Sequence, residues 1–185
     1  MKTHLTLLLA LGILSISACK KDKNDPNGLP PATQEGKNTA GFLLDGQPWL
    51  PEWKTNLSVN SPVDASWQRT VKGRSLRFGF TRQNDSESNH LDFFVPHIRQ
   101  TGTFELNQPA SPTLGDRNPA YGIYVMAKEV PDRLFLTSPT ATGTLTVTRF
   151  DTVAHIVSGT FELTVQEGKS QETHSVTEGR FDLRF

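Results

Sequence analysis

IVSGTFELTV at residues 156–165 and GRFDLRF at 179–185 carry the clearest pattern in this sequence. Apolar side chains occupy every second position of both segments. Successive side chains of a β-strand point to opposite faces of a sheet, so this alternation predicts two half-buried strands. We expect Phe161 opposite Phe181, because that pairing also places Glu162 against Arg180. A pairing shifted by two residues is the alternative, since it keeps the same faces.

Alternating or short apolar segments recur at 76–80, 91–95, 102–106, 121–126, 133–136 and 144–148, and no window of helical length keeps a 3.6-residue period. Asp45-Gly46 predicts a two-residue hairpin, because both central positions of a type I′ turn need positive φ. Lys72-Gly73 predicts a second hairpin. We therefore expect an all-β fold: a single antiparallel β-sandwich or flattened barrel of about nine or ten strands.

The first residues have the pattern of a secretory leader. Residues 5–16 form an apolar run of about a dozen residues, which suits a signal peptide and falls short of the roughly 20 residues that span a bilayer. The run ends in ISAC at 16–19, which resembles the bacterial lipobox, in which the cysteine is lipidated. The sequence thus predicts a signal peptide at 1–18 and a lipid anchor on Cys19.

Cys19 is the only cysteine, so no disulfide can form within the chain. Residues 19–36 are rich in proline, glycine and charged side chains and contain almost nothing apolar. Such a composition predicts a flexible tether that follows the lipidated cysteine. The remaining residues, 37–185, are numerous enough for one antiparallel β domain.

The charges of the chain balance, with 19 Lys and Arg residues against 19 Asp and Glu residues. The two signs are interleaved, and the absence of a basic stripe argues against nucleic acid as a partner. The expected partners are the membrane, through the lipid anchor, and a glycan or an envelope protein.

Several motifs resemble a family of Bacteroidota lipoproteins of unknown function. The family members often have Phe-Gly-Cys in the first strand, whereas this chain has Ala40-Gly41-Phe42 and lacks the second cysteine. The middle of the chain, 52–133, carries little of the signature. The resemblance implies a β-rich exported domain with no assigned activity. The motifs are ATQEGKNT at 32–39, DG at 45–46, PWLP at 48–51, GTL at 143–145, RFD at 149–151, IVSGTF at 156–161 and TEGRFD at 177–182.

The sequence lacks a G-x-S-x-G nucleophile elbow, an H-E-x-x-H zinc helix and a glycine-rich phosphate loop. His155 and His174 flank a predicted hairpin and could approach each other. Asp92 and Glu105 would form a glycosidase pair only if the fold brought them within about 5–10 Å of each other. We therefore predict no catalytic residue, no metal ligand and no cofactor.

Tryptophans and one long loop are the candidate binding surface. Exposed tryptophans stack on sugar rings or fill partner pockets, and buried ones fill a core. Trp49 follows a predicted hairpin and suits the core, whereas Trp53 lies between charged neighbours and suits the surface. The candidates are therefore Trp53 and Trp67, in the least regular part of the sequence, and Asp116, Arg117 and Asn118, at the tip of the loop 108–119.

The sequence as a whole predicts a lipoprotein of the cell envelope, anchored in the outer membrane and facing the periplasm or the cell surface. A non-catalytic binding or structural module is the expected role. Two alternatives remain open. One is a glycan-active or other hydrolytic enzyme, and the other is an outer-membrane barrel component, because the chain ends in the aromatic Phe185.

Overall fold

The computed structural model describes residues 25–54, 61–70, 72–128 and 131–185. The predicted signal peptide and Cys19 lie outside these residues. Within them the protein is all-β, with one large, mostly antiparallel open sheet of twelve strands and one short 3-10 helix. The all-β class is thereby confirmed. No helix in the described part of the chain is long and apolar enough to cross a membrane.

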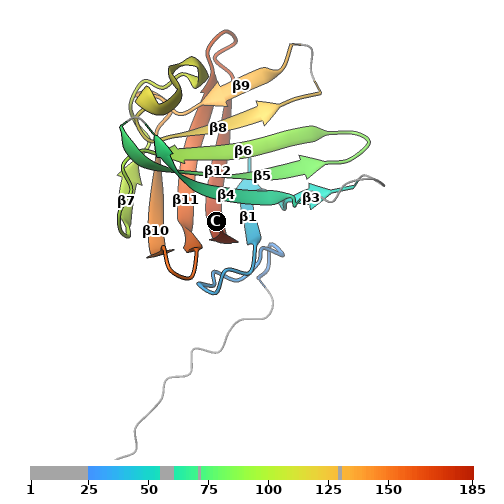
Figure 1. The fold of residues 1–185 in the computed structure, drawn as a ribbon. Helices are drawn as coiled ribbons and strands as arrows, with labels where there is room; N and C mark the ends of the chain where they lie inside the picture. Colours follow the sequence, from blue (N-terminus) through green and yellow to red (C-terminus); the bar gives the residue numbers. More distant parts are fainter. Residues whose placement is uncertain (1–24, 55–60, 71, 129–130) are drawn as a thin grey trace, which may run out of the picture.

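The strands follow the chain with short connections (Figure 1). They are β1 (Thr39–Leu44), β2 (Gln47–Trp49), β3 (Glu52–Trp53), β4 (Val63–Thr70), β5 (Gly73–Gln83), β6 (Ser88–Val95), β7 (Gly102–Glu105), β8 (Tyr121–Met126), β9 (Arg133–Leu136), β10 (Gly143–Asp151), β11 (Ile156–Glu167) and β12 (Thr173–Arg184), with the 3-10 helix η1 (Pro112–Arg117) between β7 and β8. Two of them, β3 and β4, lie in the region that the sequence analysis treats as irregular.

The sheet folds into two layers at β11. Over most of its length β11 pairs with β10 on one side and β12 on the other, but its last residues pair with β9 instead of β10. One layer therefore contains β2, β1, β12, β11, β10 and β7, and the other contains β9, β8, β6, β5, β4 and β3. Figure 1 shows the strands of the second layer crossing in front of the first.

Aromatic rings fill the space between the layers. Phe78 and Phe93 of the second layer stack on each other, with ring centroids 4.9 Å apart. Phe78 also stacks on Phe181 of β12 at 4.5 Å, and Phe93 packs against Phe161 of β11 at 4.9 Å. Each of these side chains is at most 2% exposed, and burial of a ring of this size contributes about 1.5–3 kcal/mol. These contacts hold the two layers together.

The register of β11 and β12 differs from the predicted one. Phe161 lies opposite Gly179 and Gly159 lies opposite Phe181, which is the alternative pairing shifted by two residues. A Cβ atom on Gly179 would lie 2.3 Å from the ring of Phe161, so the ring covers the glycine. A Cβ atom on Gly159 would lie 2.9 Å from the ring of Phe181. The prediction of Phe161 opposite Phe181 is wrong because each ring needs the space beside a glycine.

Both predicted hairpins are confirmed. Asp45 and Gly46 have φ values of 49° and 78°, as a type I′ turn requires, and they join β1 to β2. Thr70 pairs with Gly73 at the end of the β4–β5 hairpin. Trp49, which follows the first hairpin, is 2% exposed and belongs to the core as predicted.

Residues 25–37, here called the N-terminal strap, lie against β12. The side chain of Leu29 is buried, and Asp25 forms an ion pair with Arg180 at 2.9 Å. The strap therefore differs from the flexible tether expected at 19–36. Only residues 19–24 of that segment are left as a possible tether, and they lie outside the described residues.

The buried carboxylate of Asp182 binds the strap. It accepts hydrogen bonds from the backbone N–H groups of Glu35, Gly36 and Lys37 at 2.7–3.2 Å and from the hydroxyl of Thr33 at 2.5 Å. Ser158 of β11 donates a fifth bond at 2.7 Å. Burial opposes ionisation, but these donors outweigh it and lower the pKa of Asp182 to about 2.

Asp182→Asn should lower the free energy of unfolding at pH 7 by about 2–3 kcal/mol, because an amide leaves donors of the strap unpaired. The folded-state pKa lies below the unfolded value of about 3.9, so the stabilisation is complete above that value and is lost as the pH falls toward 2. Urea denaturation between pH 7 and pH 2.5 measures both effects. The exposed Asp85→Asn is the control, and a wild-type advantage that stays constant with pH would contradict the assignment.

Candidate functional site

The structure separates the predicted site residues. Trp53 in β3 and Trp67 in β4 are both half-buried, and they lie in different parts of the second layer. Asp116 and Arg117 belong to η1, and Asn118 follows it. These five residues do not form one surface, so each must be considered in its own surroundings.

Asn118 is a structural residue of the loop. It is 3% exposed, accepts a hydrogen bond from the N–H of Ser111 at 2.9 Å, and donates to the carbonyl oxygens of Ser111 and Gly115 at 2.8 and 3.0 Å. The expectation that Asn118 lies at the loop tip is wrong, because its amide closes the loop around η1. Asp116 pairs with Arg77 of β5 at 3.2 Å and ties the loop to the sheet, while Arg117 is exposed.

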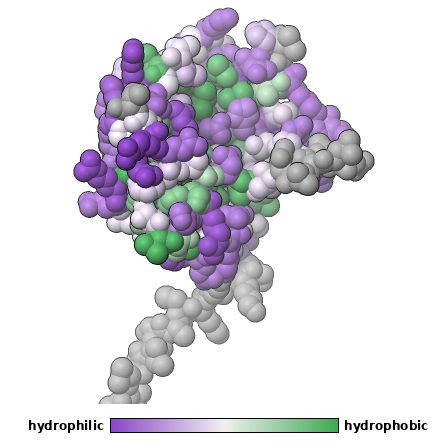
Figure 2. Space-filling model, viewed as in Figure 1, coloured by the Kyte–Doolittle hydropathy of each residue, from purple (hydrophilic) through white to green (hydrophobic). Residues whose placement is uncertain are grey.

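Strand β8 is buried on both faces. Tyr124 points into the core, whereas Tyr121, Ile123 and Val125 join Phe94 in a second apolar cluster on the outer face of the layer. Figure 2 shows hydrophobic residues over β8 and β9 on this face. Most half-buried strands have one polar face, whereas β8 has apolar side chains on both faces.

A groove of about 410 Å³ lies on this outer face, and we call it the acidic groove. Its apolar wall includes Tyr121, Ile123 and Leu134. Its charged groups are Asp64 of β4, Arg77 of β5, and His90 and Asp92 of β6. The Nε2 atom of His90 lies 3.6 Å from a carboxylate oxygen of Asp92.

The two carboxylates of the acidic groove face each other across Gly79. Asp64 and Asp92 pair with Gly79 from its two sides, and a Cβ atom there would lie 2.0 Å from Oδ1 of Asp92 and 3.5 Å from Oδ1 of Asp64. The two oxygens are therefore at most 5.5 Å apart. Burial and the Asp64 charge raise the pKa of Asp92 to about 7 against the effect of Arg77, even though 46% of its side chain is exposed.

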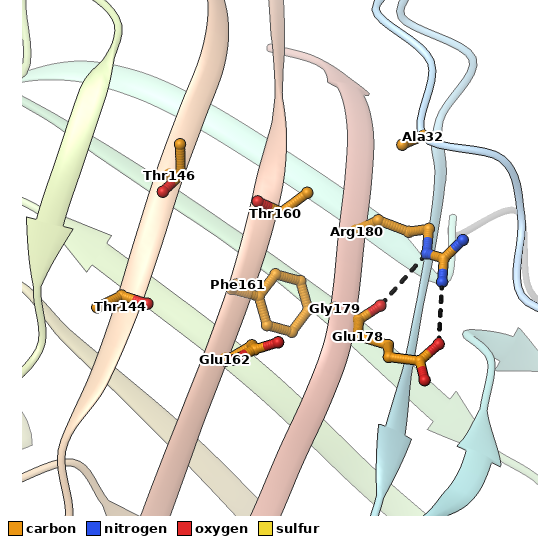
Figure 3. A pocket seen from close by; sticks show the side chains of 9 residues that line it. All are labelled: Ala32, Thr144, Thr146, Thr160, Phe161, Glu162, Glu178, Gly179 and Arg180. Carbon is orange, nitrogen blue, oxygen red and sulfur yellow. Dashed lines mark hydrogen bonds and ion pairs between the residues drawn. The ribbon is translucent and has the colours of Figure 1, made fainter.

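A shallow hollow of about 390 Å³ lies on the outer face of the other layer (Figure 3). Thr144, Thr146 and Thr160 supply hydroxyl groups along β10 and β11, and Phe161 reaches the hollow beside Gly179. Its one cation, Arg180, is already paired with Asp25 and Glu178. The positive charge of this hollow is thus used within the protein, and its other charged residue, Glu162, is exposed.

The third hollow, which we call the arginine hollow, has a volume of about 470 Å³ and lies at the β4–β5 hairpin. Trp67 pairs with Leu76, and two residues nearer the turn Arg69 pairs with Arg74. Because side chains alternate along a strand, the two arginines extend from the same face as Trp67. His97, Ile98 and Arg99, which follow β6, complete the wall.

Aromatic packing holds the wall of the arginine hollow in place. The ring of Trp67 meets those of Phe150 and Phe185 edge-on, at 5.6 and 6.2 Å, and the guanidinium of Arg74 lies 4.1 Å from the centre of the Trp67 ring. Phe185 also stacks on Phe150 at 5.6 Å. Trp67 therefore carries Arg74, and its own Nε1 is buried without a hydrogen-bond partner among the described residues.

Sequence reasoning found Trp67 but missed Arg69, Arg74, His97 and Arg99. A hairpin centred on Lys72-Gly73 would place Arg69 opposite Leu76, so that pattern does not predict the pair of arginines. They lie opposite each other because Thr70 pairs with Gly73 in the structure. His97 and Arg99 follow β6 and reach the hollow only through the fold. His155 and His174, which could have approached each other, lie apart: His155 lies against Phe185, and His174 lies against Asp45 at the other end of β12.

The structure shows no group of three or more His, Cys, Asp or Glu residues that could hold a metal ion within the described ranges. Comparison with known proteins adds no relative. No protein-family model matches the chain, and searches of the curated proteins and of the solved structures gave no match.

Proposed function

We propose that this protein is a lipoprotein of the cell envelope that acts as a non-catalytic binding module, with the arginine hollow as its binding site. The observation that carries the proposal is the chemistry of that hollow. It has an aromatic wall in Trp67, and the exposed side chains of Arg69, Arg74 and Arg99 supply its hydrogen-bond donors. A volume of about 470 Å³ lies within the range of about 300–1,000 Å³ that small-molecule sites occupy.

The location rests on the leader. The apolar run, the ISAC sequence at 16–19 and the resemblance to Bacteroidota lipoproteins support a lipid anchor at Cys19 in the outer membrane, facing the periplasm or the cell surface. A glycan or an envelope protein is the class of ligand that such a location supplies.

Cys19→Ala should abolish incorporation of labelled fatty acid and release the protein from the membrane fraction, because it removes the lipid attachment site. Fractionation of cells that express the full-length chain, followed by detection of the label, measures both. Cys19→Ser is a second variant that changes the thiol alone. Unchanged labelling in both variants would contradict the anchor.

The binding proposal is tested on a glycan array with the full-length chain. Trp67→Leu should reduce the signal at least about tenfold, because it removes both the aromatic wall and the support of Arg74. Trp53→Leu is the matched control, as Trp53 is also half-buried but does not line the arginine hollow. Near-ultraviolet circular dichroism checks that both variants fold. Equal losses in the two variants would contradict a site at Trp67.

The acidic groove supports a second candidate function, the hydrolysis of a glycosidic bond. The observation that favours it is that Asp64 Oδ1 and Asp92 Oδ1 lie at most 5.5 Å apart, a limit compatible with the separation of about 5–5.5 Å between the carboxyl groups of retaining glycosidases. The raised pKa of Asp92 suits a proton donor to the leaving oxygen. Asp64 would then attack the anomeric carbon, and water would release the sugar.

A hydrolase screen with chromogenic glycosides tests this second function. The rate of the wild type should fall as the pH rises through about 7, because Asp92 then loses the proton that it donates, and Asp92→Asn should abolish turnover because the amide cannot donate it. Asp132→Asn is the control. Turnover that persists in Asp92→Asn, or its absence in the wild type, would contradict the candidate.

A further inference from the structure

The arginines of this chain differ in how their charges are balanced. Five arginines in the described part of the chain lie within 3.8 Å of a carboxylate oxygen, and Arg184 donates to backbone carbonyl oxygens. Arg69, Arg74, Arg99 and Arg117 form no ion pair with any described residue, and the first three of them line the arginine hollow. The paired arginines are Arg77, Arg82, Arg133, Arg149 and Arg180.

The three arginines of the hollow are exposed, and two of them are neighbours on adjacent strands. Arg69 lies directly opposite Arg74 on neighbouring strands, and like charges in that position destabilise a sheet. No aspartate or glutamate lines the hollow, so nothing on its wall offsets the positive charge. His97 adds a fourth nitrogen-bearing side chain, held over Gly73, where a Cβ atom would lie 3.0 Å from its Nδ1.

From this charge arrangement we infer that the arginine hollow binds a tetrahedral oxyanion, a sulfate or phosphate group, either as the free ion or as an ester on a sugar. The inference rests on the proposed function, because it names the ligand class of the same site. The ligand would supply the negative charge that the wall lacks, and it would lie between the guanidinium groups of Arg69, Arg74 and Arg99.

The number of cations favours a tetrahedral anion over a carboxylate. A carboxylate has two oxygens in one plane, and a single bidentate guanidinium satisfies both of them. A sulfate or phosphate ester offers three free oxygens that point in different directions, and a phosphate ester carries close to two charges. The three arginines of the hollow come from β4, β5 and the segment after β6, and together they offer more hydrogen-bond donors than a carboxylate can accept.

The test is isothermal titration of the full-length chain in detergent with four probes: inorganic sulfate, inorganic phosphate, glucose 6-sulfate and glucose. The anions should bind, and glucose should not. Arg69→Gln, Arg74→Gln and Arg99→Gln should each weaken anion binding at least about tenfold, because each loses a charge-assisted pair. Arg117→Gln is the matched control, an exposed arginine outside the hollow, and should bind as the wild type does.

Thermal denaturation gives an independent measurement. Sulfate should raise the Tm of the wild type and of Arg117→Gln but not that of Arg69→Gln, whose Tm without anion should equal or exceed that of the wild type because a repulsion is removed. Tighter binding of glucose 6-sulfate than of inorganic sulfate would assign the ester as the source, and equal binding would assign the free ion.

Three results would overturn the inference. If glucose or glycans of the array bind equally well to the wild type and to the arginine variants, an oxyanion is not the ligand, while the proposed role as a binding module is kept. If the affinity for the anions falls as much in Arg117→Gln as in the variants of the hollow, the net charge of the protein and not the hollow accounts for anion binding. If the wild type binds neither the anions nor any glycan on the array, the proposed function fails together with the inference.

Discussion

The reciprocal packing of two phenylalanines on two glycines is the contact on which the rest of the structure depends. Phe161 covers Gly179, and Phe181 lies beside Gly159, so β11 and β12 can pair in only one register without a clash. That register places Asp182 opposite Ser158, where its carboxylate binds the N-terminal strap. It also brings the chain end to Phe150 and Trp67, and Trp67 in turn carries Arg74. A slip of two residues would remove the strap and the wall of the arginine hollow together.

Much of the fold could be predicted because period-two alternation and turn residues act locally. The hairpin at Asp45-Gly46 and the core position of Trp49 follow from such signals. The register could not be predicted from apolar and polar classes, because the shape of a ring beside a glycine decides it. Strand β4 was missed because Asp64, Ser66 and Gln68 on its outer face and Arg69 near its end give it few apolar residues. The strap could not be predicted because it is held mainly by backbone N–H groups that donate to the Asp182 carboxylate, and the composition of a segment does not indicate such bonds.

The candidate sites were harder to predict than the fold, since each joins segments far apart in the sequence. Asp64 and Asp92 meet only because Gly79, between them on β5, has no side chain to separate them. The arginine hollow depends on Arg99, which no strand pattern marks. In both places two like charges lie close together, Asp64 near Asp92 and Arg69 opposite Arg74, and like charges close together on a sheet destabilise it.

Strand β5 carries the two candidate sites on its opposite faces. Arg74 extends into the arginine hollow, whereas Arg77, an odd number of residues further on, extends to the acidic groove, where Asp116 and Asp92 surround it. An arginine of β5 thus has carboxylates nearby on one face of the strand, and another arginine of β5 has none on the opposite face. No carboxylate lines the arginine hollow, whereas the formal charge of the whole protein is zero. The excess of positive charge in the hollow therefore does not come from a general excess of arginine in the protein. The positive charge is confined to the hollow, so the preference for an anionic ligand belongs to that part of the surface alone.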